Sequence, residues 1–289
     1  MTQLIAVVLN WNGGDDTLGA LASLEGIQTI CVDNGSTDGS DRAVEERFPD
    51  VELLRLGTNL GFAAGNNAGI RRALERGADW VLLLNNDAVA EPGLAAALGG
   101  AAAARPDAGL LACKILDEDG VGVQYAGASF NALFGYSGRV ATSGPDRLRD
   151  VGRADGAALA VSRPAAERAG LLDESFFLYV EDVEWSLRVR AAGFAVVLVP
   201  GARVRHKGSA ASGGAASTTN LYYDTRNTIA VSERHAPLPP GLSGLRRLVV
   251  VGAHLVQALS HPARPAAIRA VLAGWRDARA GRLGQRSSR

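Results

Sequence analysis

The chain has 289 residues, and its 30 lysines and arginines balance 30 aspartates and glutamates, so the formal net charge is zero. Hydrophobic residues make up 47% and charged residues 21% of the chain, which is typical of a globular protein and argues against disorder or a long coiled coil. The balanced charge also argues against nucleic-acid binding, because that function requires a basic excess.

The charges are unevenly distributed along the chain. Residues 241–289 hold nine arginines and a single acid, Asp277, whereas residues 1–240 carry a net negative charge. We therefore expect an acidic domain over 1–240 followed by a basic tail over 241–289. In the tail, arginines flank apolar stretches such as 245–259. This pattern fits a helix on an anionic membrane surface and, equally well, a helical pair packed on the acidic domain.

The cysteines and the N-terminus indicate a compartment. Cys31 and Cys113 are isolated and have no disulfide or metal spacing, which fits a reducing environment. The apolar run at 4–9 has no basic residues before it and stops at Asn10, unlike a signal peptide. We expect a cytoplasmic protein, held at the inner face of the cell membrane if the tail binds lipid.

The first 115 residues alternate between short apolar runs and segments with helical periodicity. This alternation predicts an α/β fold with a mostly parallel sheet and helices on both faces. The predicted strands are 4–9, 29–32, 51–56, 80–84 and 109–115, and the predicted helices are 15–24, 38–48, 63–76 and 93–104. Polar residues follow several of these strands, at the sheet edge where such folds bind ligands.

The second half of the chain has fewer clear patterns, and residues 116–155 are irregular and rich in glycine. Beyond them we predict strands at 157–161 and 195–199 and helices at 164–169, 181–192 and 219–234. The Gly-, Ala- and Ser-rich segment 208–217 predicts a mobile loop. After a proline-rich hinge at 237–241, we predict two amphipathic helices at 245–259 and 263–280.

Asp33 follows the second predicted strand, in VDNGSTD at 32–38. Its carboxylate can accept a hydrogen bond from a nucleobase or a ribose hydroxyl, although a turn residue explains an aspartate here equally well. The glycines at 61, 65 and 69 are spaced GxxxGxxxG, which is not the GxGxxG of a dinucleotide phosphate turn. Dinucleotide binding is therefore not predicted.

A strongly apolar strand at 82–84 ends in Asn85, Asn86 and Asp87. Oxygen ligands suit Mg²⁺ or Mn²⁺, which would bridge the phosphates of a nucleotide, although a helix cap is an equally good explanation. His206 can complete the coordination of such a cation. Without further context, a lone histidine is more often an ordinary surface residue.

Three carboxylates stand within four residues, at Glu181, Asp182 and Glu184. Repulsion and partial burial raise the pKa of one carboxylate in such a group, as a general base requires. Glu184 and Arg188 form an i, i+4 pair that helix stability explains, and Glu181 can serve simply at the helix N-terminus. Asp182 has the least obvious structural role and is the candidate base.

Taken in order, these stretches resemble the inverting family 2 glycosyltransferases, which have the GT-A fold. The matching segments are VVLNWNG at 7–13, VDNGSTDGS at 32–40, NLGFAAGNN at 59–67, LLLNND at 82–87 and FFLYVEDVEWSLR at 176–188. The rhamnosyltransferase-like branch, which builds bacterial cell-surface glycans or decorates secondary metabolites, is the most similar. The resemblance implies sugar transfer from a TDP- or UDP-linked donor, with TDP-rhamnose suggested by the branch, to a glycan, lipid-linked or small-molecule acceptor.

The resemblance also implies a role for each matching residue. Asp182 would be the catalytic base, Asp87 and His206 would hold Mg²⁺ or Mn²⁺, and the acceptor would lie against Asp155 and Glu181. The residues implied in nucleotide-sugar binding are Asn10, Asn12, Asp33, Asn59, Gly61, Asn66, Asn85, Asn86 and Arg226. Of these, Arg226 would reach the diphosphate when the loop 208–217 closes.

The chain departs from the family pattern at one point. The first acid of the family's DxD metal motif is Asn85 here, which leaves Asp87 as the only carboxylate of the motif, so His206 would matter more than usual. In the implied mechanism, Asp182 takes a proton from the acceptor hydroxyl as that oxygen attacks the anomeric carbon from the face opposite the nucleotide. A single displacement then inverts the anomeric configuration.

Two other classes of protein compete with this interpretation. Asn85 favours a catalytically silent binding subunit of a glycan-assembly complex, whereas Asp33, Asp87 and Asp182 favour an enzyme. A sugar nucleotidylyltransferase would carry a Gly-rich loop with basic residues after the first strand. Residues 10–16 contain no basic residue, so we discount that class. The sequence makes no prediction of oligomeric state.

Overall fold

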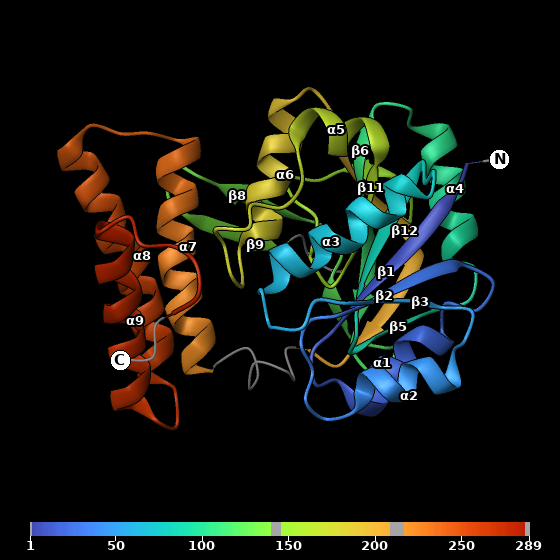
Figure 1. Cartoon of the computed structure of the whole chain (residues 1–289). Helices are drawn as coiled ribbons and strands as arrows, with labels where there is room; N and C mark the ends of the chain where they lie inside the picture. The colour runs from blue at the N-terminus through green and yellow to red at the C-terminus, as the bar shows by residue number, and fades with distance from the viewer. Residues whose placement is uncertain (1, 140–145, 209–216, 287–289) are drawn as a thin grey trace.

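The computed structural model describes residues 2–139, 146–208 and 217–286 (Figure 1). Within these residues, ten strands form one sheet. Eight lie side by side in the order β10 (Arg149–Asp150), β12 (Ala195–His206), β6 (Ala108–Leu116), β11 (Ala158–Ser162), β4 (Trp80–Asn85), β1 (Leu4–Asn10), β2 (Gln28–Asp33) and β3 (Glu52–Arg55). The other two, β5 (Ala88–Ala90) and β7 (Val123–Tyr125), pair with β12 and β6.

The sheet is mixed. Strand β1 pairs in parallel with β2 and β4, and β12 pairs in parallel with β6, as the strand–helix alternation predicts. Strand β11 is antiparallel to both of its neighbours, β4 and β6. The described residues between β6 and β11 contain no helix that would return the chain to the opposite edge, so β11 runs back from the edge where β6 ends.

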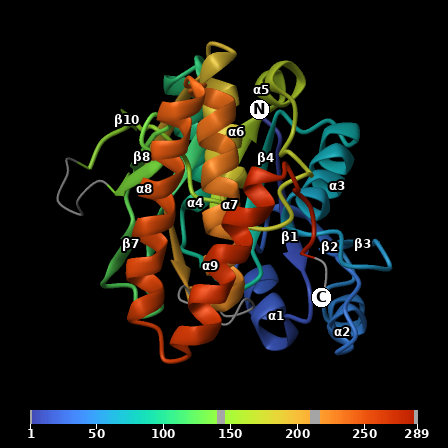
Figure 2. The ribbon, with the colours of Figure 1, turned by 90° about the vertical axis from the view of Figure 1, so that its left-hand side faces the viewer.

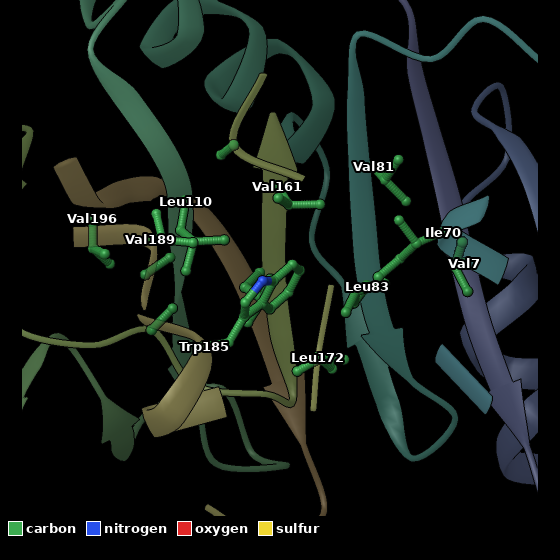
Figure 3. Close-up of a cluster of buried hydrophobic side chains, with 14 of the residues drawn as sticks. Val7, Ile70, Val81, Leu83, Leu110, Val161, Leu172, Trp185, Val189 and Val196 are labelled. Carbon is green, nitrogen blue, oxygen red and sulfur yellow. The ribbon is translucent and has the colours of Figure 1, made fainter. Parts of the chain in front are cut away.

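Helices cover both faces of the sheet, and each face has its own hydrophobic core, which confirms the predicted α/β class. Side chains alternate along β1, so that Val7 faces one core and Ala6 and Val8 face the other. The first core, shown around Trp185 in Figure 3, is closed by α3 (Phe62–Glu75), α5 (Arg163–Ala169) and α6 (Glu181–Ala191). The second core is closed by α1 (Gly14–Ala22), α2 (Ser40–Arg47) and α4 (Leu94–Ala104).

Two glycines allow α3 to lie close to the sheet. A Cβ atom on Gly69 would lie 2.3 Å from a methyl carbon of Val7, and one on Gly65 would lie 2.5 Å from a methyl carbon of Leu9. The i, i+4 spacing places both glycines on the helix face that packs against β1. Helix–sheet packing therefore accounts for the GxxxGxxxG pattern at these two positions.

Strand β12 is longer than the predicted strand 195–199. It continues past Pro200 and Gly201, where its pairing with β6 shifts register, and its last residues pair with β5. Proline and glycine usually end strands, which is why the sequence pattern did not predict this extension. Its consequence is that His206 lies opposite Ala88.

The irregular segment contributes one small hairpin that was not predicted, formed by β8 (Ala128–Asn131) and β9 (Tyr136–Arg139). Residues 209–216 of the predicted loop 208–217 lie outside the described part of the chain.

Three helices form a layer beside the sheet (Figure 1), namely α7 (Thr218–His235), α8 (Pro240–Leu259) and α9 (Arg264–Arg279). They share a third hydrophobic cluster, and a Cβ atom on Gly274 of α9 would lie 2.4 Å from the Tyr222 carbonyl oxygen of α7. Helix α8 begins at Pro240 rather than at residue 245, because Pro240 occupies the first turn, where proline is tolerated. This cluster packs α7 against the two helices of the predicted tail, α8 and α9. The predicted domain boundary at residue 240 stays a prediction.

Candidate active site

A cavity of about 1310 Å³ lies between the carboxyl ends of the parallel strands and the helical layer. Its sheet side is lined by residues at or just after strand ends, among them Trp11, Asn34, Asp87 and His206. Its opposite side is lined by residues of α7 and α8. The volume exceeds the roughly 300–1,000 Å³ of a typical small-molecule site, so the cavity has room for two substrates.

Asp87 and His206 meet at one corner of this cavity, because β5 pairs with the end of β12. The Nε2 atom of His206 lies 3.2 Å from Oδ1 of Asp87. The other ring nitrogen, Nδ1, lies 3.1 Å from Oε1 of Gln124, whose Nε2 donates to the His206 carbonyl at 2.7 Å. Gln124 is thereby oriented with its oxygen toward the ring, so Nδ1 is the donor and Nε2 faces Asp87.

This corner fits a divalent cation. Nε2 of His206 is buried and makes no aligned hydrogen bond, and a histidine whose second nitrogen is fixed by a polar side chain is the usual arrangement of a metal ligand. Burial lowers the pKa of His206, but Asp87 more than offsets this effect and the pKa is raised. Among the described residues, no group of three or more His, Cys, Asp or Glu could hold a metal ion. A cation here would have two protein ligands and take the rest from substrate and water.

The candidate base lies at another part of the same cavity. Asp182, at the start of α6, accepts hydrogen bonds from the backbone N–H groups of Gly156 (2.9 Å) and Val183 (2.7 Å). Burial raises the pKa of Asp182, and Arg153 partly offsets the rise, since its Nη1 lies 3.7 Å from Asp182 Oδ2. A raised carboxylate pKa suits a general base.

The two predicted acceptor-binding residues flank Asp182 and line the cavity. Asp155 lies 3.7 Å from the Nη1 atom of Arg153, so one buried guanidinium faces two carboxylates. Glu181 is 5% exposed, and its Oε2 is buried without a hydrogen-bond partner. Burial and the charge of Asp182 raise the pKa of Glu181 well above its usual range.

The backbone just before this acidic group is strained. Tyr179 has φ 67° and Val180 has φ 72°, in the left-handed region that β-branched residues rarely adopt. Strain of this kind persists only where the surrounding structure holds it, and it is concentrated at functional sites.

Asn10, Asn12 and Asp33 form a framework beneath the site. Asn10 is fully buried, and its Nδ2 donates to Asp33 Oδ1 at 3.0 Å while its Oδ1 accepts from Thr17 at 2.7 Å. Oδ1 of Asn12 accepts from the Thr37 N–H at 2.7 Å. None of the three predicted residues is among those that line the cavity, and they join the loops after β1 and β2 instead.

Asn59, Gly61, Asn85 and Asn86 all line the cavity. Gly61 has φ 90°, and a Cβ there would lie 2.5 Å from the Phe177 carbonyl oxygen, so this approach requires glycine.

The structure places Asn66 and Arg226 away from the cavity lining. Asn66 is 2% exposed and donates to the Phe62 carbonyl. Arg226 is 1% exposed, donates to the Gly284 carbonyl at 2.7 Å, and lies 4.8 Å from the ring centre of Tyr223. A contact of Arg226 with the diphosphate is therefore unsupported by its position, because stacking on the tyrosine of the preceding turn holds the guanidinium inside the helical layer.

Sequence reasoning missed several lining residues. Trp11 and Asn34 stand within the motifs at 7–13 and 32–40, so their spacing gave a signal that could have been used. Arg153 stands outside the motifs, two residues before Asp155. His254 and Asp224 gave none, because their contact (3.4 Å between Nε2 and Oδ2) joins α8 to α7 and depends on tertiary packing.

The chain is similar in sequence to known proteins. The model of Glycosyl transferase family 2 matches residues 9–151. N-acetylglucosaminyl-diphospho-decaprenol L-rhamnosyltransferase of Mycobacterium tuberculosis is 32% identical over 242 residues, and the match covers 75% of this chain and 78% of the relative.

Two solved structures share the fold at low sequence identity. S. aureus TarS has a TM-score of 0.59 at 15% identity, covering 96% of this chain and 81% of that one. The mannosyltransferase PcManGT from Pyrobaculum calidifontis, solved with GDP-Man and Mn²⁺, has a TM-score of 0.56 at 18% identity, covering 96% of this chain and 75% of that one.

Proposed function

This chain belongs to glycosyl transferase family 2 and is a glycosyltransferase with a GT-A-like fold, and on that premise we propose that it transfers a sugar from a nucleoside-diphosphate sugar to an acceptor hydroxyl with inversion. The observation that carries the proposal is that Asp182 and the Asp87–His206 pair line one cavity. A general base together with a cation site suits a single displacement of a nucleoside diphosphate.

In the proposed reaction, Asp182 accepts the proton of the acceptor hydroxyl. The acceptor oxygen bonds to the anomeric carbon while the bond from that carbon to the diphosphate oxygen breaks. The N–H groups of Gly156 and Val183 hold the carboxylate in place, and Arg153 partly offsets the rise in its pKa that burial causes. A positioned base of this kind contributes about 10²–10⁴ in rate.

We propose that Asp87 and His206 hold Mg²⁺ or Mn²⁺, which when bound would offset the charge that develops on the leaving diphosphate. Because Asn85 replaces an acid, the histidine supplies the second protein ligand. The P. calidifontis mannosyltransferase was solved with Mn²⁺, which supports the use of a divalent cation.

For the donor we propose a TDP- or UDP-linked sugar, with TDP-rhamnose the first candidate, because the M. tuberculosis relative is named an L-rhamnosyltransferase. Asn59, Gly61, Asn85 and Asn86 line the cavity, and we place the donor against them.

For the acceptor we propose a lipid-linked sugar, since the name of the same relative specifies a diphospho-decaprenol acceptor. Asp155 and Glu181 flank the base, and we place the acceptor sugar against them. An acceptor of this class would place the enzyme at the cytoplasmic face of the membrane.

Release of nucleoside diphosphate from a panel of donor sugars, with Mg²⁺ or Mn²⁺, tests the proposal. Asp182→Asn should lower kcat by about 10²–10⁴, and EDTA should abolish activity. Asp50→Asn is the matched control and should have no effect on activity. It changes an exposed carboxylate just before β3, at the end of that strand opposite the cavity. Nucleotide binding without turnover for any donor and acceptor would instead support a silent binding subunit.

A further inference from the structure

The outer face of α8 is apolar along its whole length. Six of its side chains are each more than half exposed, and they are Leu242, Leu245, Leu248, Val249, Val256 and Leu259. They recur at intervals of three, four and seven residues, which places them in one stripe on a helix of 20 residues, about 30 Å long. Exposed apolar surface of this extent marks an interaction site.

The opposite face of α8 is fixed to the protein. Val250, Val251 and Ala258 are buried in the cluster shared with α7 and α9. Arg246 donates to the Ala236 carbonyl at 2.6 Å, and His254 lies 3.4 Å from Asp224 of α7. By length and composition α8 is the one helix of the described residues that could cross a membrane, and 28% of its apolar segment is buried inside the protein. Its buried arginine and histidine favour a helix that lies along a surface, because insertion would expose both to lipid.

The charge beside the stripe identifies the chemistry of the partner. Helix α9 lies next to α8 on the outer side of the molecule (Figure 2) and exposes Arg269, Arg276 and Arg279 together with Leu272. The one acid of this region, Asp277, is bonded to Tyr222 and Arg282 and lies 3.4 Å from Arg276 Nε. An apolar stripe beside arginines that outnumber this single acid complements the acyl boundary and the phosphates of an anionic lipid surface.

The same helix borders the cavity. Ala253, His254 and Gln257 line it, and Ala253 lies one turn from both Val249 and Val256 of the stripe. The apolar surface and the cavity edge are therefore adjacent faces of α8. An acceptor sugar can lie in the cavity while its lipid stays in a membrane beneath the stripe.

We propose that the outer faces of α8 and α9 bind an anionic phospholipid membrane, and that the cavity edge at Ala253, His254 and Gln257 admits the lipid-linked acceptor from that membrane. The second clause rests on the proposed function, whereas the lipid contact does not depend on it.

Flotation of the full chain with phosphatidylglycerol–phosphatidylcholine vesicles tests the contact. The wild type should bind, and Leu245→Glu/Val256→Glu should bind at least about tenfold more weakly, since loss of one buried apolar side chain alone costs about that factor. Arg269→Ser/Arg276→Ser should lose about fivefold per arginine, and only on anionic vesicles. Val121→Glu, at an 81% exposed valine of the β6–β7 turn, is the matched control and should bind as the wild type does.

Three outcomes would overturn the proposal. The first is that the wild type does not bind anionic vesicles at low salt, and the second is that the glutamate variant binds them as the wild type does. The third is that light scattering shows a dimer of the wild type but a monomer of the glutamate variant, which would show a second copy on the stripe.

Transfer assays separate this proposal from the proposed function. The glutamate variant should keep wild-type transfer to a short-chain soluble acceptor and lose transfer to the long-chain acceptor in vesicles. Equal loss on both acceptors would count against the route of entry. Vesicle binding without any transfer by the wild type would contradict the proposed function alone.

Discussion

The side-chain amide of Asn227 donates a hydrogen bond of 2.7 Å to the backbone carbonyl of Tyr179, and a second one of 2.9 Å to that of Leu178. Asn227 is fully buried in α7, and the carbonyls belong to the strained segment that leads into Asp182. Helix α7, which is distant in sequence, thus fixes the backbone segment that positions Asp182, the proposed base.

Asn227→Ala should release this segment. Three hydrogen bonds are lost, because Asn227 Oδ1 also accepts from Arg226 Nε at 2.8 Å, so the free energy of unfolding should fall by about 1–3 kcal/mol. Displacement of Asp182 should lower kcat by about 10- to 100-fold with little change in the KM for the donor. Steady-state kinetics and urea unfolding measure both effects. Asn131→Ala, at the exposed end of β8, is the control, and an unchanged kcat in Asn227→Ala would contradict the positioning role.

Arg153 should set the acid limb of the pH profile. The raised pKa of Asp182 means that kcat/KM falls as the pH falls through it, at a pH above the usual range near 4 of an aspartate. The Arg153 guanidinium favours the charged carboxylate, so Arg153→Met should raise this pKa further and move the limb to higher pH. Arg153→Lys keeps the charge and should stay close to the wild type. Equal shifts in the two variants would contradict the electrostatic explanation.

The local pattern of the sequence predicted most of the framework. Continuous apolar runs identified five of the six strands in residues 1–116, and the acids at 87, 155, 181 and 182 do reach one cavity. The prediction for Asp87 succeeds because a strand pattern also fixes which residues follow its carboxyl end.

The parts of the site that the local pattern did not predict depend on contacts between residues distant in the sequence. His206 meets Asp87 only because β12 continues past Pro200 and Gly201 to pair with β5, and neither strand segment has a local signal. Asn10 and Asp33 bond to one another across two strands, which removes them from the cavity lining that their positions suggested. Burial of Arg226 likewise depends on residues 283–286 folding back over α7.

His206→Gln should weaken activation by metal. Loss of one of two protein ligands should raise the Mn²⁺ concentration for half-maximal activity at least 10- to 100-fold, the range found even for outer-shell partners. Because the pKa of His206 is raised, protons compete with the metal from a higher pH, and the concentration required should increase as the pH falls. His261→Gln, in the α8–α9 turn, is the control. An identical Mn²⁺ requirement in His206→Gln and the wild type would remove His206 from the proposed site.

Glu184 joins α6 to α7 through a buried carboxylate. Its side chain is 0% exposed, and its oxygens lie 2.7 Å from Arg188 Nε and 3.2 Å from both Arg234 Nη1 and His235 Nε2. Burial raises the pKa of Glu184, but the His235 and Arg188 contacts more than offset this effect and the pKa is lowered. The stabilisation is therefore fully present above the usual glutamate pKa of about 4.3 and is lost as the pH falls through the lowered value.

Glu184→Gln should lower the free energy of unfolding at pH 7 by about 3 kcal/mol, which is the lower end of the range for a broken buried ion pair. The lower end applies because Arg234 is partly exposed and Arg188 keeps its hydrogen bonds to the Ala169 and Leu171 carbonyls. Urea unfolding at pH 7 and pH 4 measures the difference, which should shrink at the lower pH. Glu167→Gln removes an exposed carboxylate that also pairs with an arginine, and should change stability by less than about 1 kcal/mol. Equal losses in the two variants at pH 7 would show that Glu184 acts as an ordinary surface charge.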